Sequence, residues 1–247
     1  MEPSKDASEA AKHLPKELHR NDPIAFHNHL AATWEANYRS KAFLSRVNAF
    51  ESALGECELQ GMCWLDAGCG SGTLTRWLAK RGAEVVGVDG APAMIRAARA
   101  AMVGRECEGR LRFEIANVGS LPFSDATFDA VLCSSVLEYA QDPASYLNEI
   151  ARVIKPGGIL LISIPNAESL VRMGLRITYQ LTKMVGVPRP RYMKYSRHQY
   201  SRSAFSALLR KCGYEPEYAT AFGGGLPLWL DRRSWLGRLL LLRAVRL

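Results

Sequence analysis

The chain has 247 residues, of which 48% are hydrophobic and 23% are charged. These proportions are those of a globular protein and exclude a disordered, collagen-like or low-complexity chain. There is no apolar run long enough to span a membrane, and the N-terminus lacks the apolar segment of a secretory signal, which predicts a cytoplasmic protein. The length suits one domain, which we place at residues 23–247 after a flexible tail at 1–22.

Charge is distributed unevenly along the chain, whose formal net charge is +8. Residues 1–171 carry a net charge of −4 and residues 172–247 carry +12. A uniformly basic nucleic-acid-binding protein would not be divided in this way, so nucleic acid is disfavoured as a partner. The basic C-terminal part is expected to meet an anionic substrate or a lipid surface, with RNA as an alternative.

The six cysteines form no CxxC pair and no cluster with histidine of the kind that binds zinc. Scattered thiols of this kind are typical of a reducing compartment. We therefore expect buried core residues, with neither a disulfide framework nor a metal site.

Periodicity predicts the elements in chain order. Apolar residues recur every three to five positions between Pro23 and Leu54, which predicts two helices, and we assign residues 23–57 to an N-terminal helical cap. Continuous apolar runs then predict strands at 62–67, 84–89, 111–117, 128–135 and 159–165. Helices are predicted between them, at 73–82, 91–102 and 142–154. Buried strands that alternate with helices indicate βαβ units and an α/β fold with a mainly parallel sheet.

Residues 168–200 break this alternation and are expected to form a lid inserted after the fifth strand. Within this insertion, a helix that starts near Leu170 would be amphipathic, with Arg172, Arg176 and Lys183 among apolar residues, and could lie on an anionic membrane. Alternatively, the arginines and the lysine of 189–197 could bind an acidic substrate, or the basic face could simply be solvated. A helix at 201–213 and strands at 214–222 and 237–246 complete the chain.

The most specific feature is a glycine-rich stretch, LDAGCGSG at residues 65–72, between a predicted strand and a predicted helix. Glycine lets the backbone turn tightly and approach a ligand at the carboxyl end of a strand. The spacing from Gly68 is G-x-G-x-G, whereas a dinucleotide-binding fingerprint would require glycine at Thr73. Asp66 adds a negative charge that repels a pyrophosphate and suits a cationic ligand.

A second acidic residue ends the next predicted strand. Asp89 closes the run VVGVD about 20 residues after the glycine loop, where a carboxylate can accept hydrogen bonds from both hydroxyls of a ribose. Either feature alone is a weak signal. Together, at this spacing and in one βαβ unit, they predict a nucleoside ligand that carries positive charge.

At these residues the sequence resembles the class I S-adenosylmethionine-dependent methyltransferases, in particular the group with the methyltransferase-11 type domain. The resemblance covers about residues 62–165 and rests on LDAGCGSG, VVGVDGAPAMI, SLPFSDATFDAVLCSSVLEY and RVIKPGGILLISIPN. It implies a Rossmann-like, doubly wound sheet of seven mostly parallel strands with an antiparallel last strand. It also implies S-adenosylmethionine as the cofactor and methyl transfer to a small-molecule or lipid-like acceptor, most often at oxygen.

The resemblance further implies which residues contact the cofactor. Those expected around the methionine part are Asp66, Gly68, Cys69, Gly70, Cys133 and Ser134. Those expected at the ribose and adenine are Asp89, Gly90, Met94, Asn117 and Val118. Asn117 stands where the family usually has aspartate.

The N-terminal cap supplies two more expected contacts. Trp34 and Tyr38 are four residues apart on one helical face, so they either pack as core residues or form an aromatic flap over the sulfonium, which cation–π attraction favours. Arg46 loosely matches an arginine that related quinone-pathway methyltransferases place against the cofactor carboxylate. We therefore count Tyr38 and Arg46 among the expected cofactor-binding residues.

An alcohol, phenol or carboxylate acceptor can require a base that removes a proton. Glu138 and Tyr139 are candidates by their position after the fourth strand, although Tyr139 stands where the family often has histidine and a phenol is the poorer base. His198 in the lid is a third candidate. His27 and His29 are further candidates from the N-terminal helices.

Two other functions compete with this interpretation. An RNA or protein methyltransferase would use the basic C-terminal face, but CSSV at residues 133–136 replaces the N/D-P-P-Y/F tetrapeptide of amino-group methylases, and aromatic residues are not interleaved with the basic ones. A non-catalytic protein could retain the fold and bind the cofactor. A lipid-like acceptor would go with peripheral membrane contact through 168–200 and the basic C-terminus.

Overall fold

The computed structural model describes residues 22–37, 41–102, 110–183, 195–223, 230 and 232–247. The predicted flexible tail, apart from Asp22, and the predicted contact of Tyr38 lie outside these residues. The same holds for the middle of the predicted lid, including three of the basic residues proposed there for an acidic substrate.

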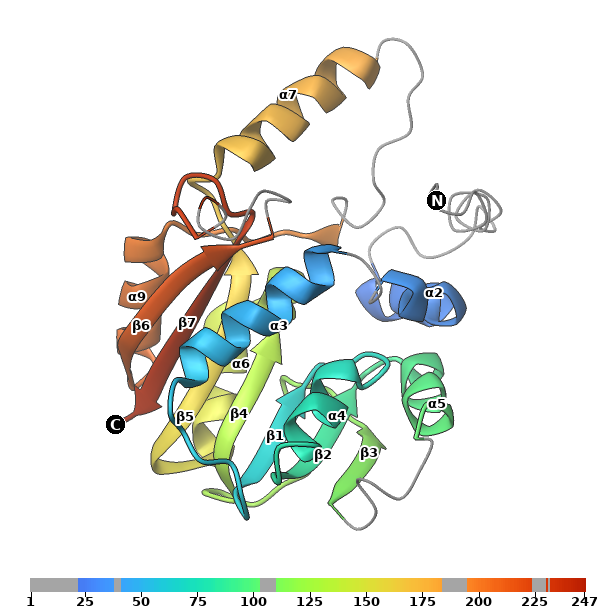
Figure 1. Ribbon diagram of the computed structural model, residues 1–247, viewed down its shortest axis with the longest axis vertical. Coiled ribbons are helices and arrows are strands. Elements are labelled where there is room, and N and C mark those ends of the chain that lie inside the picture. The colour runs from blue at the N-terminus through green and yellow to red at the C-terminus, as the bar shows by residue number, and fades with distance from the viewer. Residues whose placement is uncertain (1–21, 38–40, 103–109, 184–194, 224–229, 231) are drawn as a thin grey trace.

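A single seven-stranded sheet forms the centre of the molecule, with the strand order β3-β2-β1-β4-β5-β7-β6 (Figure 1). The strands are β1 (Cys63–Ala67), β2 (Glu84–Asp89), β3 (Leu111–Ile115), β4 (Phe128–Ser134), β5 (Ile154–Pro165), β6 (Tyr214–Phe222) and β7 (Leu239–Arg246). The first five strands of that order run parallel, and β7 runs antiparallel to both of its neighbours. The predicted Rossmann-like sheet with an antiparallel last strand is confirmed.

The helices of the described residues flank both faces of the sheet, except α7, which extends away from it (Figure 1). They are α2 (Pro23–Asn37), α3 (Lys41–Leu54), α4 (Thr73–Ala79), α5 (Pro92–Ala100), the short 3₁₀ helix η2 (Leu137–Tyr139), α6 (Pro143–Val153), α7 (Leu170–Lys183) and α9 (Arg202–Lys211). One core cluster joins α6 and α9 to one face, and a second joins α3 and α4 to the other. Successive residues of β1 show this division, because Trp64 and Leu65 are both fully buried but belong to different clusters.

Helix α6 begins as its sequence predicts. Asp142 is the N-cap and accepts the Ala144 N–H at 3.0 Å, and Pro143 occupies the first turn. The following strand differs from the prediction, because β5 starts at Ile154 and includes the KPGG stretch that we expected to precede it. The positive φ of Gly157 (77°) accommodates an irregularity there, after which β4 and β5 pair in register.

The N-terminal cap consists of two helices, as predicted. Helix α3 packs on the sheet near β6 and β7, and its Phe50 is fully buried in the core. Helix α2 instead packs against α5, where Ala31 contacts Ala91 and Met94. Because α5 follows the carboxyl end of β2, this contact puts α2 near the edge of the sheet that carries the glycine loop.

The described parts of the predicted lid, residues 168–200, form two structures. Helix α7 begins just after the carboxyl end of β5 and extends away from the sheet (Figure 1). Residues 195–200 return to the sheet edge, where Asn166 and Tyr200 form an isolated bridge. None of the helices in the described part of the chain combines the length and apolar character that crossing a membrane requires.

Candidate cofactor and acceptor site

The glycine loop after β1 forms a tight elbow at the carboxyl edge of the sheet. All three of its glycines have positive φ values, between 54° and 82°, a conformation that other residues rarely adopt. A Cβ on Gly68 would lie 2.2 Å from Cγ2 of Val136, so the site has no room for a side chain at this position. The N–H groups of Gly68 and Cys69 both donate to the Val88 carbonyl at 2.8 Å, which ties the elbow to β2.

Asp89 connects the end of β2 to this elbow. Its Oδ2 accepts the Gly70 N–H at 2.9 Å and its Oδ1 accepts the Ala91 N–H at 2.8 Å. Burial raises the pKa of Asp89, and the two backbone hydrogen bonds partly oppose this rise. Each carboxylate oxygen has lone-pair capacity for another donor. A carboxylate held in this way suits a pair of neighbouring hydroxyls, such as those of a ribose.

Asp66 lies beneath the elbow and is only 1% exposed. Its Oδ2 accepts the Thr75 hydroxyl at 2.7 Å. Burial and the nearby charge of Asp89 raise the pKa of Asp66 to about 7, although the hydrogen bonds from Thr75 lower it. A cation bound at the elbow would favour the ionised form of Asp66. The chemistry of this donor set therefore fits the sulfonium and ammonium groups of S-adenosylmethionine.

Arg46 reaches from α3 to the carboxyl end of β4. Its Nη1 donates to Ser134 Oγ at 2.7 Å and its Nη2 donates to Ser135 Oγ at 3.4 Å. Ser163 of β5 lies beside them, with its Oγ 3.3 Å from Ser134 Oγ and accepting the Ser135 N–H at 3.1 Å. A guanidinium among hydroxyl groups suits a carboxylate ligand. The arrangement fits the role predicted for Arg46 and Ser134 at the methionine end of the cofactor.

Glu138 and Tyr139 belong to η2, which follows β4. The Glu138 side chain is 5% exposed, and burial raises the pKa of its carboxyl, although a hydrogen bond with the Ser196 side chain lowers it. The Tyr139 ring is half-buried and meets the His27 ring edge-on, with 5.0 Å between centroids. Of these two catalytic candidates, only Tyr139 has a partly exposed side chain.

His198 lies in residues 195–200, the part of the predicted lid that contacts η2. The backbone N–H groups of Arg197 and His198 donate to the Glu138 carbonyl at 2.8 and 3.4 Å. His198 Nε2 lies 3.0 Å from the Ala140 carbonyl, which can only accept, so this nitrogen carries the proton. The ring also stacks on Tyr200 at 6.5 Å. These contacts favour a role for His198 in holding the segment in place, and its predicted catalytic role stays a prediction.

On the side expected to hold the adenine, Asn117 is exposed and Val118 is buried. The Asn117 Oδ1 accepts the Gly119 N–H at 2.9 Å and the Tyr146 hydroxyl at 3.3 Å. Its amide nitrogen can still donate to a ligand, so an asparagine can serve at this position.

Two other predicted contacts have fully buried side chains. Met94 is 1% exposed and packs against Ala31 and Ala91, and Cys133 is completely buried in the core between β1 and β5. Burial also raises the pKa of the Cys133 thiol, which is therefore neutral. Their contact with a cofactor stays a prediction, since the structure shows them as packing residues.

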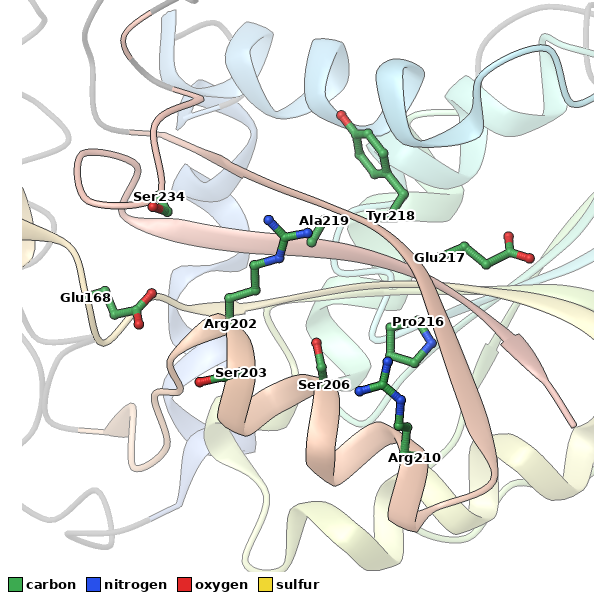
Figure 2. A pocket seen from close by; sticks show the side chains of 10 residues that line it. All are labelled: Glu168, Arg202, Ser203, Ser206, Arg210, Pro216, Glu217, Tyr218, Ala219 and Ser234. Carbon is green, nitrogen blue, oxygen red and sulfur yellow. The ribbon is translucent and has the colours of Figure 1, made fainter.

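A cavity of about 560 Å³ lies elsewhere, between α9 and the edge strand β6 (Figure 2). Arg202, Ser206 and Arg210 project toward it from α9. Strands β4, β5 and β7 separate β6 from β1, and no residue predicted for the cofactor lines this cavity. It is a feature distinct from the elbow.

The order of the strands, the glycine elbow after β1 and the acidic end of β2 define the class I methyltransferase fold. Comparison with known families agrees, because residues 65–162 match the model of a methyltransferase domain family. The fold is therefore that of a class I methyltransferase, as the resemblance predicted, and residues 65–162 carry the similarity to this domain family.

The curated relatives carry one recurring name. The ubiquinone biosynthesis O-methyltransferase of Alkalilimnicola ehrlichii is 41% identical over 109 residues, which cover 44% of this chain and 43% of the relative. The protein of the same name from Psychrobacter cryohalolentis is 29% identical over 196 residues, which cover 78% of this chain and 73% of the relative. The chain thus spans less than half the length of the first of these relatives.

Solved structures share the fold at low identity. The S-adenosylmethionine-dependent methyltransferase of Mesorhizobium loti has a TM-score of 0.61 at 24% identity, covering 82% of this chain and 98% of that one. Magnesium protoporphyrin IX methyltransferase of Synechocystis has a TM-score of 0.61 at 19% identity, and the match covers 98% of this chain and 94% of that one. These similarities show the fold.

Sequence reasoning missed several contacts of the site. Ser163 was detectable in principle, because a hydroxyl residue interrupts the apolar run ILLISIP. Thr75, the partner of Asp66, has no such signal, because threonine is common in helices. The Asn28 Oδ1 that accepts the Ala93 N–H at 2.8 Å joins two helices far apart in sequence, which no local pattern indicates.

Proposed function

We propose that this chain transfers the methyl group of S-adenosylmethionine to a hydroxyl oxygen of a small-molecule or lipid-like acceptor. The observation that carries the proposal is the hydrogen bond between Asp89 and the elbow, where a half-buried carboxylate accepts the Gly70 N–H beside Gly68, a position with no room for a side chain. The names of the relatives, which are O-methyltransferases, support oxygen as the atom that is methylated.

The proposed role of the chain's own residues is to align the cofactor with the acceptor. When bound, the cofactor supplies a methyl group on a positively charged sulfur. Asp89 would hold the ribose and Arg46 the carboxylate, so that the cofactor is fixed at two separated points. Fixing it in this way turns an encounter in solution into an oriented displacement. The buried charge of Asp66 would favour the cationic cofactor over its neutral-sulfur product.

Calorimetry followed by a labelled-methyl assay tests this proposal. We expect binding of S-adenosylmethionine and S-adenosylhomocysteine but not of NAD. With tritiated S-adenosylmethionine and catechol probes, with and without an octyl chain, we expect label in the organic extract. Label in precipitated RNA or protein would support the rival methyltransferase, and cofactor binding without any transfer would support a non-catalytic protein.

We further propose that α7 contacts an anionic lipid surface. Leu170, Met173 and Ile177 are each about half exposed and lie on one side of the helix, with Arg172 and Arg176 on the other. The Leu170 N–H donates to the Trp235 carbonyl at 2.8 Å, so the exposed Trp235 side chain lies near the base of α7.

Charge adds to this apolar surface. Arg176, Arg232 and Arg233 are exposed around it, and the C-terminal part of the chain carries the basic excess. Apolar side chains beside cations are the combination that binds anionic bilayer surfaces. Because α7 starts at the carboxyl edge of the sheet (Figure 1), such contact would bring a lipid-like acceptor to the side of the molecule that carries the elbow.

A further inference from the structure

His27 has a defined arrangement of its two ring nitrogens. It lies in the second turn of α2, and its Nδ1 is 2.7 Å from the Pro23 carbonyl oxygen. A carbonyl can only accept a hydrogen bond, so Nδ1 carries the ring proton. In the neutral ring, Nε2 is therefore the nitrogen with the basic lone pair.

Contacts on two sides fix the position of α2. On the side of α5, Asn28 Oδ1 accepts the Ala93 N–H at 2.8 Å. On the side of the lid, the Phe26 ring stacks on Tyr195 with 4.7 Å between centroids. The residues on either side of His27 are thus anchored to separate parts of the chain. This anchoring holds the imidazole at one place beside the site.

That place lies between the predicted cofactor contacts and η2. The His27 ring meets the Tyr139 ring at 5.0 Å and 79°. The imidazole also lies within electrostatic reach of the Asp89 carboxylate, whose pKa a positive charge on His27 would lower. One turn earlier, Ile24 Cδ1 lies 3.2 Å from where a Cβ of Gly90 would be. Helix α2 therefore lies over the end of β2, with His27 toward the segment that follows β4.

The other candidate bases are placed less favourably. The protonated Nε2 of His198 donates to the Ala140 carbonyl, so this nitrogen has no basic lone pair. The Glu138 carboxyl is 5% exposed and hydrogen-bonded to Ser196. His29, two residues further along α2, is exposed. Among the candidate bases that the structure describes, only His27 has both a defined tautomer and a position near Asp89 and Tyr139.

We propose that His27 is a catalytic residue that takes the proton of the acceptor hydroxyl, with the Pro23 carbonyl holding its tautomer. This proposal rests on the proposed methyl transfer to oxygen. The hydroxyl proton passes to Nε2 while the hydroxyl oxygen bonds to the methyl carbon and the electron pair of the breaking carbon–sulfur bond stays on sulfur. The Pro23 carbonyl and the Asp89 carboxylate then stabilise the imidazolium. Transfer of a proton to an imidazole favours an acidic hydroxyl, such as that of a phenol or an enol.

The test compares His27→Gln with His29→Gln, a control at an exposed position of the same helix. The probe is 4-nitrocatechol, whose absorbance reports ionisation, added to the complex with S-adenosylhomocysteine at a pH where the free probe is neutral. We expect the wild type and His29→Gln to bind it as the anion and His27→Gln to lose the anion spectrum. The affinity for S-adenosylhomocysteine should stay within about threefold, while kcat with the same catechol falls about 100-fold or more.

Any of three results would overturn the proposal. The wild-type complex does not bind 4-nitrocatechol, or it binds the probe in the neutral form, or His27→Gln ionises the probe as much as the wild type does. A wild type that does not bind S-adenosylhomocysteine would refute the proposed function instead. If His27→Gln fails to fold, ¹⁵N NMR of the wild-type histidines decides the matter. The proposal requires a neutral His27 with the proton on Nδ1, and the opposite tautomer contradicts it.

Discussion

The Asp89 carboxylate accepts the N–H of Gly70 at 2.9 Å, so the end of β2 holds the elbow that follows β1. Asp89 ends β2 and Gly70 follows β1, and these neighbouring parallel strands have their carboxyl ends at one edge of the sheet. The bond fixes the backbone of Gly70, which has no side chain that could pack. It also means that the carboxylate proposed to bind the ribose is the one that holds the elbow in place.

Asp89→Ala should weaken cofactor binding. The variant loses charged hydrogen bonds of the kind that contribute about 1.5–3 kcal/mol, which corresponds to roughly 10- to 100-fold in the dissociation constant for S-adenosylhomocysteine. Calorimetry measures this constant, with the exposed Asp125→Ala as a control of equal charge change. An unchanged constant in a folded Asp89→Ala protein would contradict the ribose assignment.

Cofactor affinity should depend on pH through Asp66. Its pKa is raised to about 7, so below that pH it is mostly neutral and attracts a cation poorly. The affinity for S-adenosylmethionine should therefore rise by about threefold to tenfold between pH 6 and 8 and then level off. Asp66→Asn should abolish this rise in affinity. If the rise persists in the variant, another titratable group causes the pH dependence.

The same raised pKa affects the stability of the protein without ligand. Between about pH 4 and pH 7 the folded state keeps a proton on Asp66 that the unfolded chain releases. The free energy of unfolding should consequently fall as the pH rises through this window. Urea denaturation of the wild type and Asp66→Asn should show a shallower fall in the variant, because it lacks this proton.

Arg46→Met should weaken binding of the cofactor but leave the fold intact. The substitution keeps much of the apolar stem and removes the donors to Ser134 and Ser135. We expect the dissociation constant for S-adenosylhomocysteine to rise by roughly 10-fold or more. Arg81→Met, which removes a surface arginine paired with Glu51, is the matched control. Equal affinities in the two variants would exclude Arg46 from the carboxylate site.

Gly68→Ala should destabilise the protein more than Gly157→Ala. Both glycines have a positive φ (82° and 77°), which costs an alanine about 1–2 kcal/mol. Only Gly68 also faces a clash, with Val136 Cγ2 at 2.2 Å, whereas nothing lies within 4 Å of a Cβ at Gly157. Thermal unfolding measures the difference. The double variant Gly68→Ala/Val136→Ala should recover part of it, and no recovery would show that strain of the backbone dominates.

Substitution of Met173 and Ile177 by glutamate should reduce membrane binding. The pair contributes half-exposed apolar surface to one side of α7, and carboxylates there oppose both the apolar contact and the attraction to anionic lipid. Sedimentation with vesicles of phosphatidylcholine and phosphatidylglycerol tests this, with Met102→Glu, at an equally exposed methionine elsewhere, as the control. A wild type that stays in the supernatant at low salt would refute the lipid contact.

Much of the fold was predictable because its signals are local. The boundaries of β2 and β6 agree with the predicted runs, and Asp142 and Pro143 start α6 as their residue types require. The KPGG stretch was predicted wrongly as a loop before the strand. Strand β5 starts early because Ile154 pairs with Phe128 of β4 ahead of the irregularity, and a single run of residues does not contain that information.

The elbow and the acidic residues proposed to bind the cofactor were also predictable from sequence. A glycine loop and an acidic residue at fixed spacing in a βαβ unit can meet in only one way, because parallel strands end at the same edge of the sheet. Asp66, Gly70 and Asp89 were therefore found without a structure. Their electrostatic state was not, since the pKa of Asp66 depends on burial by the whole fold.

The sequence by itself thus determined the sheet, the elbow and the acidic residues around it, because each depends on short-range periodicity and steric limits. Only the tertiary structure decided which side chains from distant helices join them. Arg46 meets Ser134 across 88 positions, and His27 meets Tyr139 through the packing of α2 on α5 and the lid. Such contacts result from the packing of apolar surfaces across the whole chain, and for that reason no local pattern encodes them.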